Sequence, residues 1–386
     1  MNLRGYRRSD GRVGIRNKVL ILPTCACSSE TCMKVAALVE GAISFTNQNG
    51  CSQTNIDVQY TIDTLVGFAA NPNVYGTIVV GLGCEVCSAG RIADLIRRRT
   101  NKPLKEFVIQ EDGGTVGTIE KAVAAAAEMA EAASMQEKVP ISWENIILAT
   151  ECGGTDATSG IAANPAMGAA ADLLMEHGGT VILSETPEFI GAEHILASRA
   201  ATPELSEKIL STVKAWEDYM KLLKTDLRDS NPSPGNKKGG ISSLEEKSLG
   251  CIYKGGSTTI QDVVRYGEEV HSKGLVIMDT PGNDTSSLCA MAAGGAAIAI
   301  FSSGRGTPVG NPIMPVIKVT GNSQTYKKMT CNIDFDASPV ITGTKTIEEL
   351  GEALFQMIGE TVNGKRTKAE VLGMNEIAIA RYCNFT

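Results

Sequence analysis

Residues 145–156 have the sequence Asn-Ile-Ile-Leu-Ala-Thr-Glu-Cys-Gly-Gly-Thr-Asp, and this segment shows the pattern on which the fold depends. Its first half, 145–150, is a short apolar run with the length of a β-strand. Its second half is a glycine-rich loop that carries an acid and a cysteine. A continuous apolar run bounded by such a loop is typical of a strand buried on both faces, as strands of parallel sheets are. The segment therefore predicts a parallel strand with polar groups at its carboxyl end.

The same pattern recurs along the chain and alternates with helical stretches, which indicates repeated β-α units. The other predicted strands are 18–24, 75–83, 107–110, 180–184, 275–279, 297–302 and 315–319. The clearest predicted helices are 31–43, 118–136, 204–224 and 347–362. We predict an α/β protein in which a mostly parallel, Rossmann-like sheet domain is followed by a second α/β domain.

A turn-rich segment separates the two predicted domains. Residues 229–240 read Asp-Ser-Asn-Pro-Ser-Pro-Gly-Asn-Lys-Lys-Gly-Gly, a composition typical of loops and boundaries. We predict a first domain over 1–228 with Cys/Gly loops, a Gly/Pro-rich loop or linker over 229–245, and a second domain over 246–386.

The composition excludes several classes of protein. The 386 residues are 43% hydrophobic and 20% charged, as in ordinary globular proteins, and their formal net charge is -7. Such a chain lacks the surplus of Lys and Arg that binds nucleic acid or an anionic membrane. The first residues lack the apolar segment of a signal peptide, and no stretch is long and apolar enough for a membrane span. We expect a cytoplasmic protein that binds neither nucleic acid nor membranes, with its 11 cysteines reduced.

Three cysteines are candidate metal ligands. Cys84 and Cys152 follow predicted strands in glycine-rich loops, and Cys51 lies in another turn. The carboxyl ends of parallel strands meet at one edge of a sheet, so such loops can converge on one site. Thiolates favour iron and zinc, and the three cysteines predict an iron site, Fe²⁺ or an iron-sulfur cluster, with a position left open for substrate. The alternative is packing, because free cysteine is among the most buried residue types.

Acids in the same kind of loop are candidate catalytic groups. Removing a proton next to a carboxylate requires a base, and a nearby metal ion lowers the barrier. Glu151 and Asp156 are our first choices, and Glu85 is a third candidate. The alternative for each is structural, because Asp and Glu often cap helices or accept hydrogen bonds from loop amides.

Two cations in glycine-containing loops are candidate substrate ligands. Lys237 and Arg305 are predicted to hold an anionic substrate, a carboxylate or a sulfonate. Asn236, Asn283 and Asp284 lie in similar loops and are predicted to contact the same substrate. The alternative for the cations is a solvated charge in a surface turn. The chain has neither a GxxxxGK[ST] phosphate loop nor the third glycine of a dinucleotide fingerprint, so no nucleotide cofactor is indicated.

Taken in order, eight motifs resemble the large catalytic part of the altronate and galactarate dehydratase family. They are GRVGIRN (11–17), NGCSQ (49–53), GLGCE (81–85), ECGGTDATSGIAANP (151–165), NPSPGNKKGG (231–240), LEEKSLGC (244–251), PGND (281–284) and FSSGRGTP (301–308). Members of that family are metal-dependent lyases, generally associated with iron, that remove water from sugar acids to give 2-keto-3-deoxy acids. The family also includes the beta subunit of (2R)-sulfolactate sulfo-lyase, which releases sulfite from a similar 2-hydroxy acid.

The resemblance implies the large catalytic subunit of a hydro-lyase that acts on a sugar acid such as altronate or galactarate. The alternative within the family is the sulfo-lyase subunit, which releases sulfite and pyruvate. Some relatives carry a small β-rich domain ahead of the matched region and others supply it as a separate chain, so we expect a small β-rich partner subunit and a homo-oligomer. Two rivals from other classes are a non-catalytic sugar-acid-binding subunit and a redox protein that uses Cys84 and Cys87.

Overall fold

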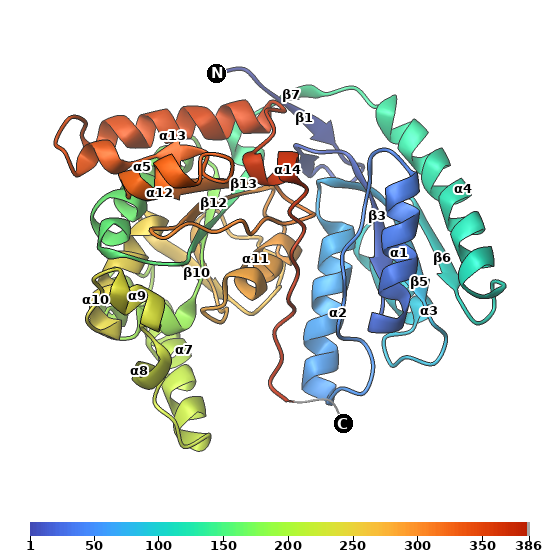
Figure 1. Cartoon of the computed structure of the whole chain (residues 1–386), viewed down its shortest axis with the longest axis horizontal. Coiled ribbons are helices and arrows are strands. Elements are labelled where there is room, and N and C mark those ends of the chain that lie inside the picture. The colour runs from blue at the N-terminus through green and yellow to red at the C-terminus, as the bar shows by residue number, and fades with distance from the viewer. Residues whose placement is uncertain (384–386) are drawn as a thin grey trace.

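The computed structural model describes residues 1–383 and contains two large parallel sheets joined by a small antiparallel one. The first large sheet has the strand order β4-β3-β5-β6, and all its neighbouring strands run parallel. Its strands are β3 (Lys18–Pro23), β4 (Ala42–Ile43), β5 (Val74–Gly81) and β6 (Leu104–Val108). Its helices are α1 (Ala26–Leu38), α2 (Asn55–Ala70), α3 (Ala89–Arg99) and α4 (Gly114–Ser134). Figure 1 shows this sheet on the right of the molecule.

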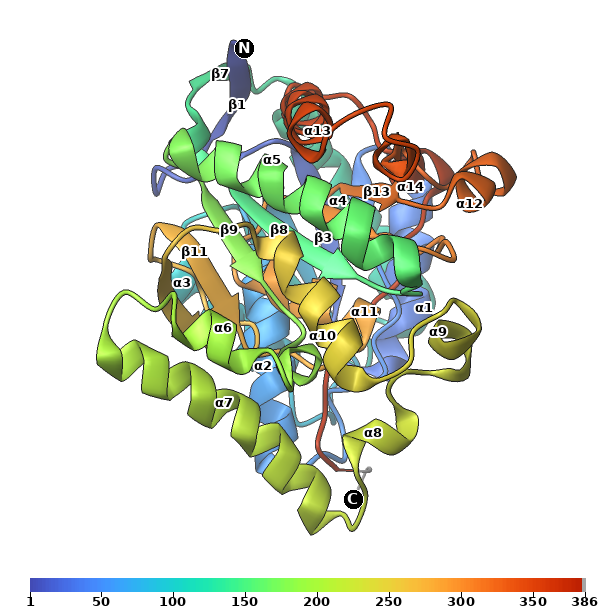
Figure 2. The same cartoon turned by 90° about the vertical axis from the view of Figure 1, so that its left-hand side faces the viewer.

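The second sheet has the order β10-β11-β9-β8-β12-β13-β14 and is also parallel throughout. Its strands are β8 (Ile147–Cys152), β9 (Thr180–Leu183), β10 (Ile260–Val264), β11 (Gly274–Met278), β12 (Ile298–Ser302), β13 (Val316–Thr320) and β14 (Phe335–Asp336). Its long helices are α5 (Asn164–Glu176), α7 (Pro203–Leu222), α11 (Asp284–Ala293) and α13 (Ile347–Val362). Figure 2 shows α5 and α13 together on one side of the sheet and α7 at its lower edge.

Shorter elements fill the connections. The helices are α6 (Glu193–Ala197), α8 (Leu227–Ser230), α9 (Pro234–Lys238), α10 (Leu244–Cys251), α12 (Ser323–Lys328) and α14 (Lys368–Leu372), together with η1 (Trp143–Asn145), η2 (Ser159–Ala163), η3 (Thr186–Phe189), η4 (Ile252–Gly255) and η5 (Ser338–Val340). The antiparallel sheet has the order β2-β1-β7 and consists of β1 (Leu3–Arg7), β2 (Val13–Gly14) and β7 (Val139–Ile141). Within residues 1–383 we find no helix with the length and apolar character needed to cross a bilayer.

Successive side chains of a strand point to opposite faces of its sheet, so the apolar side chains of the two large sheets divide among three hydrophobic cores. Val19 and Ile21 face α1 and α4, whereas Leu20 and Leu22 face α2 and α3 on the other side of the first sheet. The core beneath α2 and α3 continues through α11 into the second sheet, where it includes Phe301. The remaining face of the second sheet packs against α5, α7 and α13. The two sheets therefore share one hydrophobic core.

The predicted α/β class and its parallel strands are confirmed. The change from one sheet to the other falls between β6 and β8, whereas we placed the division at 229–245. Strands β8 and β9 were expected with the first sheet, but they pair with β12 and β11 of the second. Buried strands of both sheets have the same apolar sequence, so the pattern indicates a strand without indicating its neighbour. The segment 229–245 holds α8 and α9 and forms part of the site described next.

Candidate active site

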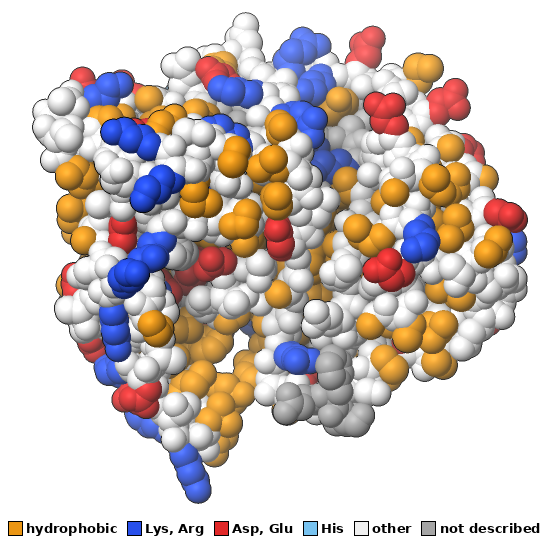
Figure 3. Space-filling model, viewed as in Figure 1, with side chains coloured by type: hydrophobic (Ala, Val, Ile, Leu, Met, Phe, Trp, Pro, Cys, Tyr) orange, Lys and Arg blue, Asp and Glu red, His pale blue; other side chains and the backbone are white. Residues whose placement is uncertain are grey.

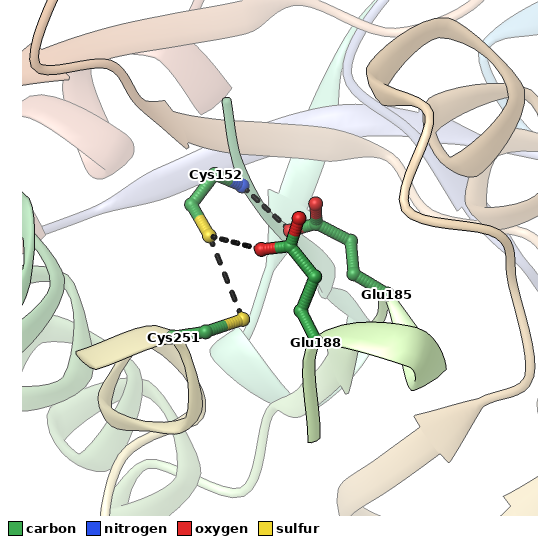
Figure 4. A group of neighbouring side chains, drawn as sticks. All are labelled: Cys152, Glu185, Glu188 and Cys251. Carbon is green, nitrogen blue, oxygen red and sulfur yellow. Dashed lines mark hydrogen bonds between the residues drawn. The ribbon is translucent and has the colours of Figure 1, made fainter. Parts of the chain in front are cut away.

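The carboxyl ends of β8 and β9 bring acids and a thiol together in a buried site. Cys152 ends β8, and Glu185 and Glu188 follow β9 (Figure 4). Glu185 has φ 76° and ψ 57°, a left-handed conformation that is costly for a residue with a side chain. Its backbone nitrogen donates to Thr280 Oγ1 at 2.8 Å, and its Oε2 accepts from the Cys152 nitrogen at 2.9 Å. These contacts hold the strained turn and point its carboxylate into the protein.

A second cysteine completes a thiol-carboxylate group. Cys251, at the end of α10, places its Sγ 3.5 Å from Cys152 Sγ, and Glu188 Oε2 lies 3.9 Å from the same sulfur. Potential ligand atoms of Cys152, Glu185, Glu188 and Cys251 all lie within 4.8 Å of one another. The contact with Cys251, burial and the nearby carboxylate of Glu185 raise the pKa of Cys152 well above its usual range.

A fully buried lysine sits inside this group. Lys254 Nζ lies 2.7 Å from Cys251 Sγ, 2.8 Å from Glu185 Oε2 and 3.6 Å from Cys152 Sγ. Burial alone would lower its pKa, but the sulfur atoms and neighbouring carboxylates outweigh burial and raise the pKa well above the ordinary lysine value. An ammonium ion therefore already fills the space between the thiols and Glu185.

A second group consists of carboxylates alone. Oxygen atoms of Glu151, Glu185 and Asp284 lie within 4.8 Å of one another. Glu151 Oε2 accepts hydrogen bonds from Ser287 at 2.6 Å and Ser184 at 3.1 Å. Among the described residues, the Oε1 atoms of Glu151 and Glu185 have no hydrogen-bond partner. Burial and repulsion from Glu185 raise the pKa of Glu151 well above its usual range, and the same causes together with Glu188 raise the pKa of Asp284 to about 7.

An ion pair connects the buried acids to the surface. Lys247 Nζ, from α10, lies 2.5 Å from Glu188 Oε1 and 3.1 Å from Asn231 Oδ1. Burial lowers the pKa of Lys247, but the Glu188 carboxylate outweighs burial and raises it above the usual lysine value. Burial and the proximity of Glu185 raise the pKa of Glu188. Lys247 therefore stays charged and is the group that stabilises ionised Glu188.

The charges of the site fit a divalent cation. Four acids (Glu151, Glu185, Glu188 and Asp284) face two lysines (Lys247 and Lys254), which leaves two negative charges if every acid is ionised. Two bound protons or one divalent ion would balance them, because uncompensated buried charges are costly. The carboxylate group has free oxygen atoms, whereas Lys254 fills the thiol group. The donor set therefore fits a cation that prefers oxygen ligands, at Glu151, Glu185 and Asp284.

A pocket of about 430 Å³ opens beside these groups. Chemically active side chains in its wall are Cys152, Glu188, Lys247, Asn231, Asn236, Asn283 and Asp284. Trp216, Met220 and Leu227 form an apolar side of the wall. A pocket that combines one apolar side with converging ionic groups is the usual form of a small-molecule site.

The three predicted metal cysteines do not form one group. Cys51 and Cys84 are exposed and belong to loops of the first sheet, and neither is in a group of potential metal ligands with Cys152. Glu85 is buried and accepts hydrogen bonds from Thr24 Oγ1 at 2.8 Å and Gly83 N at 2.7 Å, which is the structural alternative that we considered. Burial raises the pKa of Cys87 to about 11, which does not favour a reactive Cys84–Cys87 pair.

Asp156 lies in the expected loop, but its carboxylate accepts hydrogen bonds from neighbouring backbone nitrogens. Its Oδ1 accepts from Thr158 N at 2.9 Å and Ser159 N at 3.2 Å, and its Oδ2 accepts from Asn322 Nδ2 at 2.9 Å. It is absent from the residues that line the pocket at Cys152. These contacts correspond to the capping alternative.

The predicted substrate ligands divide into two sets. Asn236, Asn283 and Asp284 line the pocket. Lys237 and Arg305 are exposed and do not line it. Arg305 Nη1 donates to Gly235 O at 3.4 Å, so it contacts the α9 turn. The structure thus brings the polar loop residues to the site and leaves the two predicted cations outside the pocket lining.

The cations inside the site come from a segment to which we assigned no role. Lys247 and Cys251 belong to the LEEKSLGC motif, and Lys254 follows one turn later. Cys251 was not among the three cysteines that we predicted to bind metal. The spacing of residues 247, 251 and 254 places their side chains on one face of consecutive helical turns, and this periodicity was the signal available in the sequence.

Two family models together match nearly all of the chain. The model described as D-galactarate dehydratase/altronate hydrolase, second domain, matches residues 5–134, and the model described as D-galactarate/altronate dehydratase, C-terminal, matches residues 143–384. The chain belongs to the galactarate/altronate dehydratase family. The two matches follow the two large sheets of this family member, since 5–134 contains β3 to β6 and 143–384 contains β8 to β14.

Relatives within the family have two kinds of name. The chain is 36% identical to the (2R)-sulfolactate sulfo-lyase subunit beta of Chromohalobacter salexigens, over 98% of this chain and 96% of the relative. It is 36% identical to the altronate dehydratase of Bacillus subtilis, over 97% of this chain and 77% of the relative. It is 31% identical to the galactarate dehydratase (L-threo-forming) of Escherichia coli, over 97% of this chain and 76% of the relative. These names confirm the predicted family and support its enzyme class, the lyases.

Proposed function

We propose that this member of the galactarate/altronate dehydratase family is the catalytic subunit of a metal-dependent hydro-lyase that converts a sugar acid, altronate or galactarate, to a 2-keto-3-deoxy acid. The observation that carries the proposal is the buried group of four acids and two lysines at the carboxyl edge of the second sheet, next to a pocket of about 430 Å³. A non-catalytic binding subunit would have no need of so many buried ionisable groups, because their burial costs stability.

The reaction removes the proton on C2, next to the carboxylate, and the hydroxyl on C3. The resulting enol becomes the 2-keto acid, and water is the other product. We assign proton removal to Glu188, because its carboxylate lines the pocket, and because burial and the nearby Glu185 raise its pKa and so make it a stronger base. Lys247 holds Glu188 in place at 2.5 Å and provides a positive charge for the substrate carboxylate.

Glu151, Glu185 and Asp284 are the residues that would hold a divalent metal ion through their oxygen atoms, and iron(II) is the ion that the family resemblance implies. A bound divalent ion would polarise the carboxylate and the adjacent hydroxyl, which makes the C2 proton more acidic. Asn236 and Asn283, which also line the pocket, orient the remaining hydroxyls. The apolar side formed by Trp216 and Met220 limits access of water to the reacting carbon.

A second candidate function is sulfite release from a sulfonated 2-hydroxy acid. One observation favours it. A relative named (2R)-sulfolactate sulfo-lyase subunit beta is 36% identical to this chain, as similar as the altronate dehydratase of Bacillus subtilis. The first step is the same in both reactions, and only the group that leaves from C3 differs. The relative is named as a subunit, which supports our expectation of a partner subunit, and we propose that this partner is small and β-rich.

The test is anaerobic purification with and without the candidate small subunit, followed by metal analysis. The preparation is then incubated with altronate, galactarate and sulfolactate, and release of 2-keto acid and of sulfite is measured. We expect keto acid from one of the sugar acids. Sulfite from sulfolactate alone would replace the first candidate by the second. A metal-loaded, folded complex that turns over none of the three would contradict both.

A further inference from the structure

A basic pocket lies at the opposite edge of the first sheet from the cysteine loops. It has a volume of about 410 Å³ and forms where the start of β3, the segment before β7 and the segment around α14 meet. Lys18 is the first residue of β3, and Cys25 lies in the loop that follows the end of this strand. The pocket and the cysteine loops therefore lie at opposite ends of a six-residue strand, roughly 20 Å apart. Figure 3 shows Lys and Arg side chains gathered in the upper middle of this face, near the position of α14 in Figure 1.

Positive charge exceeds negative charge in the wall of this pocket. Arg16, Lys18, Lys138 and Arg366 line it, and the acid among its lining residues is Glu370. The charge balance of these side chains is therefore plus three. Burial lowers the pKa of Lys18 to about 8; the carboxylate of Glu370 opposes this effect, and repulsion by Arg16 and Arg366 adds to it. Lys18, Arg16 and Arg366 thus lie close enough for their positive charges to repel one another.

Several of these cations retain donors for a ligand. Lys18 donates one hydrogen bond to Pro312 O at 2.9 Å, Lys138 donates one to Asn363 O at 3.0 Å, and Arg366 donates one to Glu370 O at 2.6 Å. An ammonium group has three donors and a guanidinium has five. The guanidinium of Arg16, in contrast, donates its hydrogen bonds to Glu370 and to backbone carbonyls. Arg16 therefore contributes positive charge to the pocket from a fixed position.

An independent observation comes from a buried amide in the same wall. Asn311 is 4% exposed, and its Oδ1 accepts from Ile313 N at 2.9 Å and Met314 N at 3.3 Å. These bonds determine which end of the amide is oxygen. Among the described residues, Asn311 Nδ2 has no hydrogen-bond partner. A buried donor without an acceptor is costly, and an oxygen atom of a ligand would satisfy it.

We propose that this pocket, lined by Lys18, Lys138, Arg366 and Asn311, binds a small oxyanion with more than one negative charge. Its ligand is of the phosphate or dicarboxylate kind, because both supply several oxygen acceptors to ammonium, guanidinium and amide donors at once. The site is separate from the proposed active site and does not depend on the reaction assigned there.

Calorimetric titration of the full chain with inorganic phosphate, and separately with succinate, tests the proposal and distinguishes the two ligand sources. Two variants address the pocket. Asn311→Asp keeps the acceptor and the size of the side chain but replaces the free donor with an oxygen. The double variant Lys138→Gln/Arg366→Gln removes two charges. The matched control Lys34→Gln/Lys121→Gln removes two exposed charges from α1 and α4.

We expect one saturable binding event for at least one of the two anions in the unmodified protein. Binding should weaken by about tenfold or more in both pocket variants and change less than about twofold in the control. It should also weaken as sodium chloride is added, because salt screens charge. Absence of saturable binding of either anion up to about 10 mM at low salt, or equal affinity in the pocket variants, would overturn the proposal. If Asn311→Asp fails to fold by circular dichroism, the double variant decides.

Discussion

Glu188 and Lys247 form a buried ion pair. In the proposed reaction Glu188 removes the proton, and Lys247 positions Glu188 and binds the substrate carboxylate. Both side chains are at least nine-tenths buried, and their charged atoms lie 2.5 Å apart. Removing one partner leaves the other charge without compensation, which typically costs about 3–5 kcal/mol. The pair therefore affects stability and catalysis, and the two effects are separable by the choice of substitution.

Glu188→Gln should lower kcat by about 10²- to 10⁴-fold, because it removes the base but retains the size of the side chain. Lys247→Met should raise KM and also destabilise the fold, because Glu188 then has no counter-charge. Steady-state kinetics and urea denaturation measure these effects. The control is Lys214→Met, in an exposed pair with Asp218, where a change under about 1 kcal/mol and normal activity are expected. Normal kcat in Glu188→Gln would remove Glu188 from the mechanism.

Metal binding should stabilise the protein through the carboxylate group. A metal ion whose free concentration is 100 times its dissociation constant adds about 2.7 kcal/mol to the free energy of unfolding. Addition of Fe²⁺ or Mn²⁺ under anaerobic conditions should raise Tm, and a chelator should reverse the increase. Glu151→Gln should reduce the response, whereas Cys51→Ser and Cys84→Ser should retain it. Loss of the response in the two cysteine variants alone would instead favour the metal site predicted from the sequence.

Glu370 is stabilised by the guanidinium of Arg16. Burial opposes ionisation of Glu370, but hydrogen bonds from Arg16 at 2.7 and 2.8 Å outweigh burial and lower its pKa. A carboxyl group with a lowered folded-state pKa stabilises the protein above its unfolded pKa of about 4.3, and this contribution disappears as the pH falls through the folded value.

Glu370→Gln should therefore destabilise the protein at pH 7, by about 1–3 kcal/mol, and the difference from the unmodified protein should shrink as the pH falls below about 4. Denaturation curves at several pH values measure it. Glu360→Gln, in an exposed pair with Lys365, is the control and should change little at any pH. A difference that grows on acidification would contradict the assigned pKa direction.

The loops that follow the strands are close together because glycine lets them approach. A Cβ atom at Gly153, just after β8, would lie 2.2 Å from Asp284 Oδ2 at the start of α11. The carboxylate is the movable end of its side chain, so an alanine would displace Asp284 with little effect on the fold. The elements themselves would remain, while the geometry of the carboxylate group would change.

Gly153→Ala should therefore lower kcat/KM by about tenfold or more and weaken metal binding, with a stability change of about 1 kcal/mol. Gly90→Ala is the matched control, because a Cβ there meets no atom within 4 Å and lies in helix α3, where alanine is favoured. Kinetics, metal titration and thermal unfolding of both variants provide the comparison. Unchanged activity in Gly153→Ala would show that the position of Asp284 is unimportant.

At the scale of the whole molecule, buried asparagines connect the two large sheets. Asn73, just before β5, accepts from Ile15 N at 2.9 Å and donates to Ala297 O at 2.8 Å and Ile313 O at 3.1 Å. Asn71 donates to Ala292 O at 2.8 Å and Ala296 O at 2.9 Å. Together with the hydrophobic core that runs from the first sheet into the second, these bonds predict that the two sheets unfold together.

Asn73→Ala should lower the free energy of unfolding by about 2–5 kcal/mol, because it leaves several buried backbone groups without partners. Exposed Asn101→Ala is the control and should have little effect. Labelling of two buried thiols in denaturant, Cys32 in α1 and Cys289 in α11, reports on each sheet separately. The two thiols should become reactive at the same denaturant concentration, and earlier labelling of Cys32 would show that the sheets unfold independently.

The amino-acid sequence by itself determined the class of fold, because short apolar runs such as 145–150 and 180–184, which are typical of buried strands, alternate with helical stretches. It also determined the family, through eight ordered motifs, and it indicated Cys152, Glu151 and Asp284 as residues of loops at strand ends. The pairing of strands, in contrast, depends on contacts between distant segments. Strands with the same apolar composition fit either sheet, so β8 and β9 could not be assigned from their own residues.

Only the tertiary structure decided which polar groups meet. Cys51 and Cys84 have the same glycine-rich surroundings in the sequence as Cys152, yet they belong to the edge of the other sheet. Lys254 and Cys251 reach Cys152 from about 100 residues away along the chain, because α10 and η4 pack against the end of the second sheet. Local sequence specifies the conformation of a loop, whereas burial and the balance of charge, on which the chemistry depends, are properties of the folded chain.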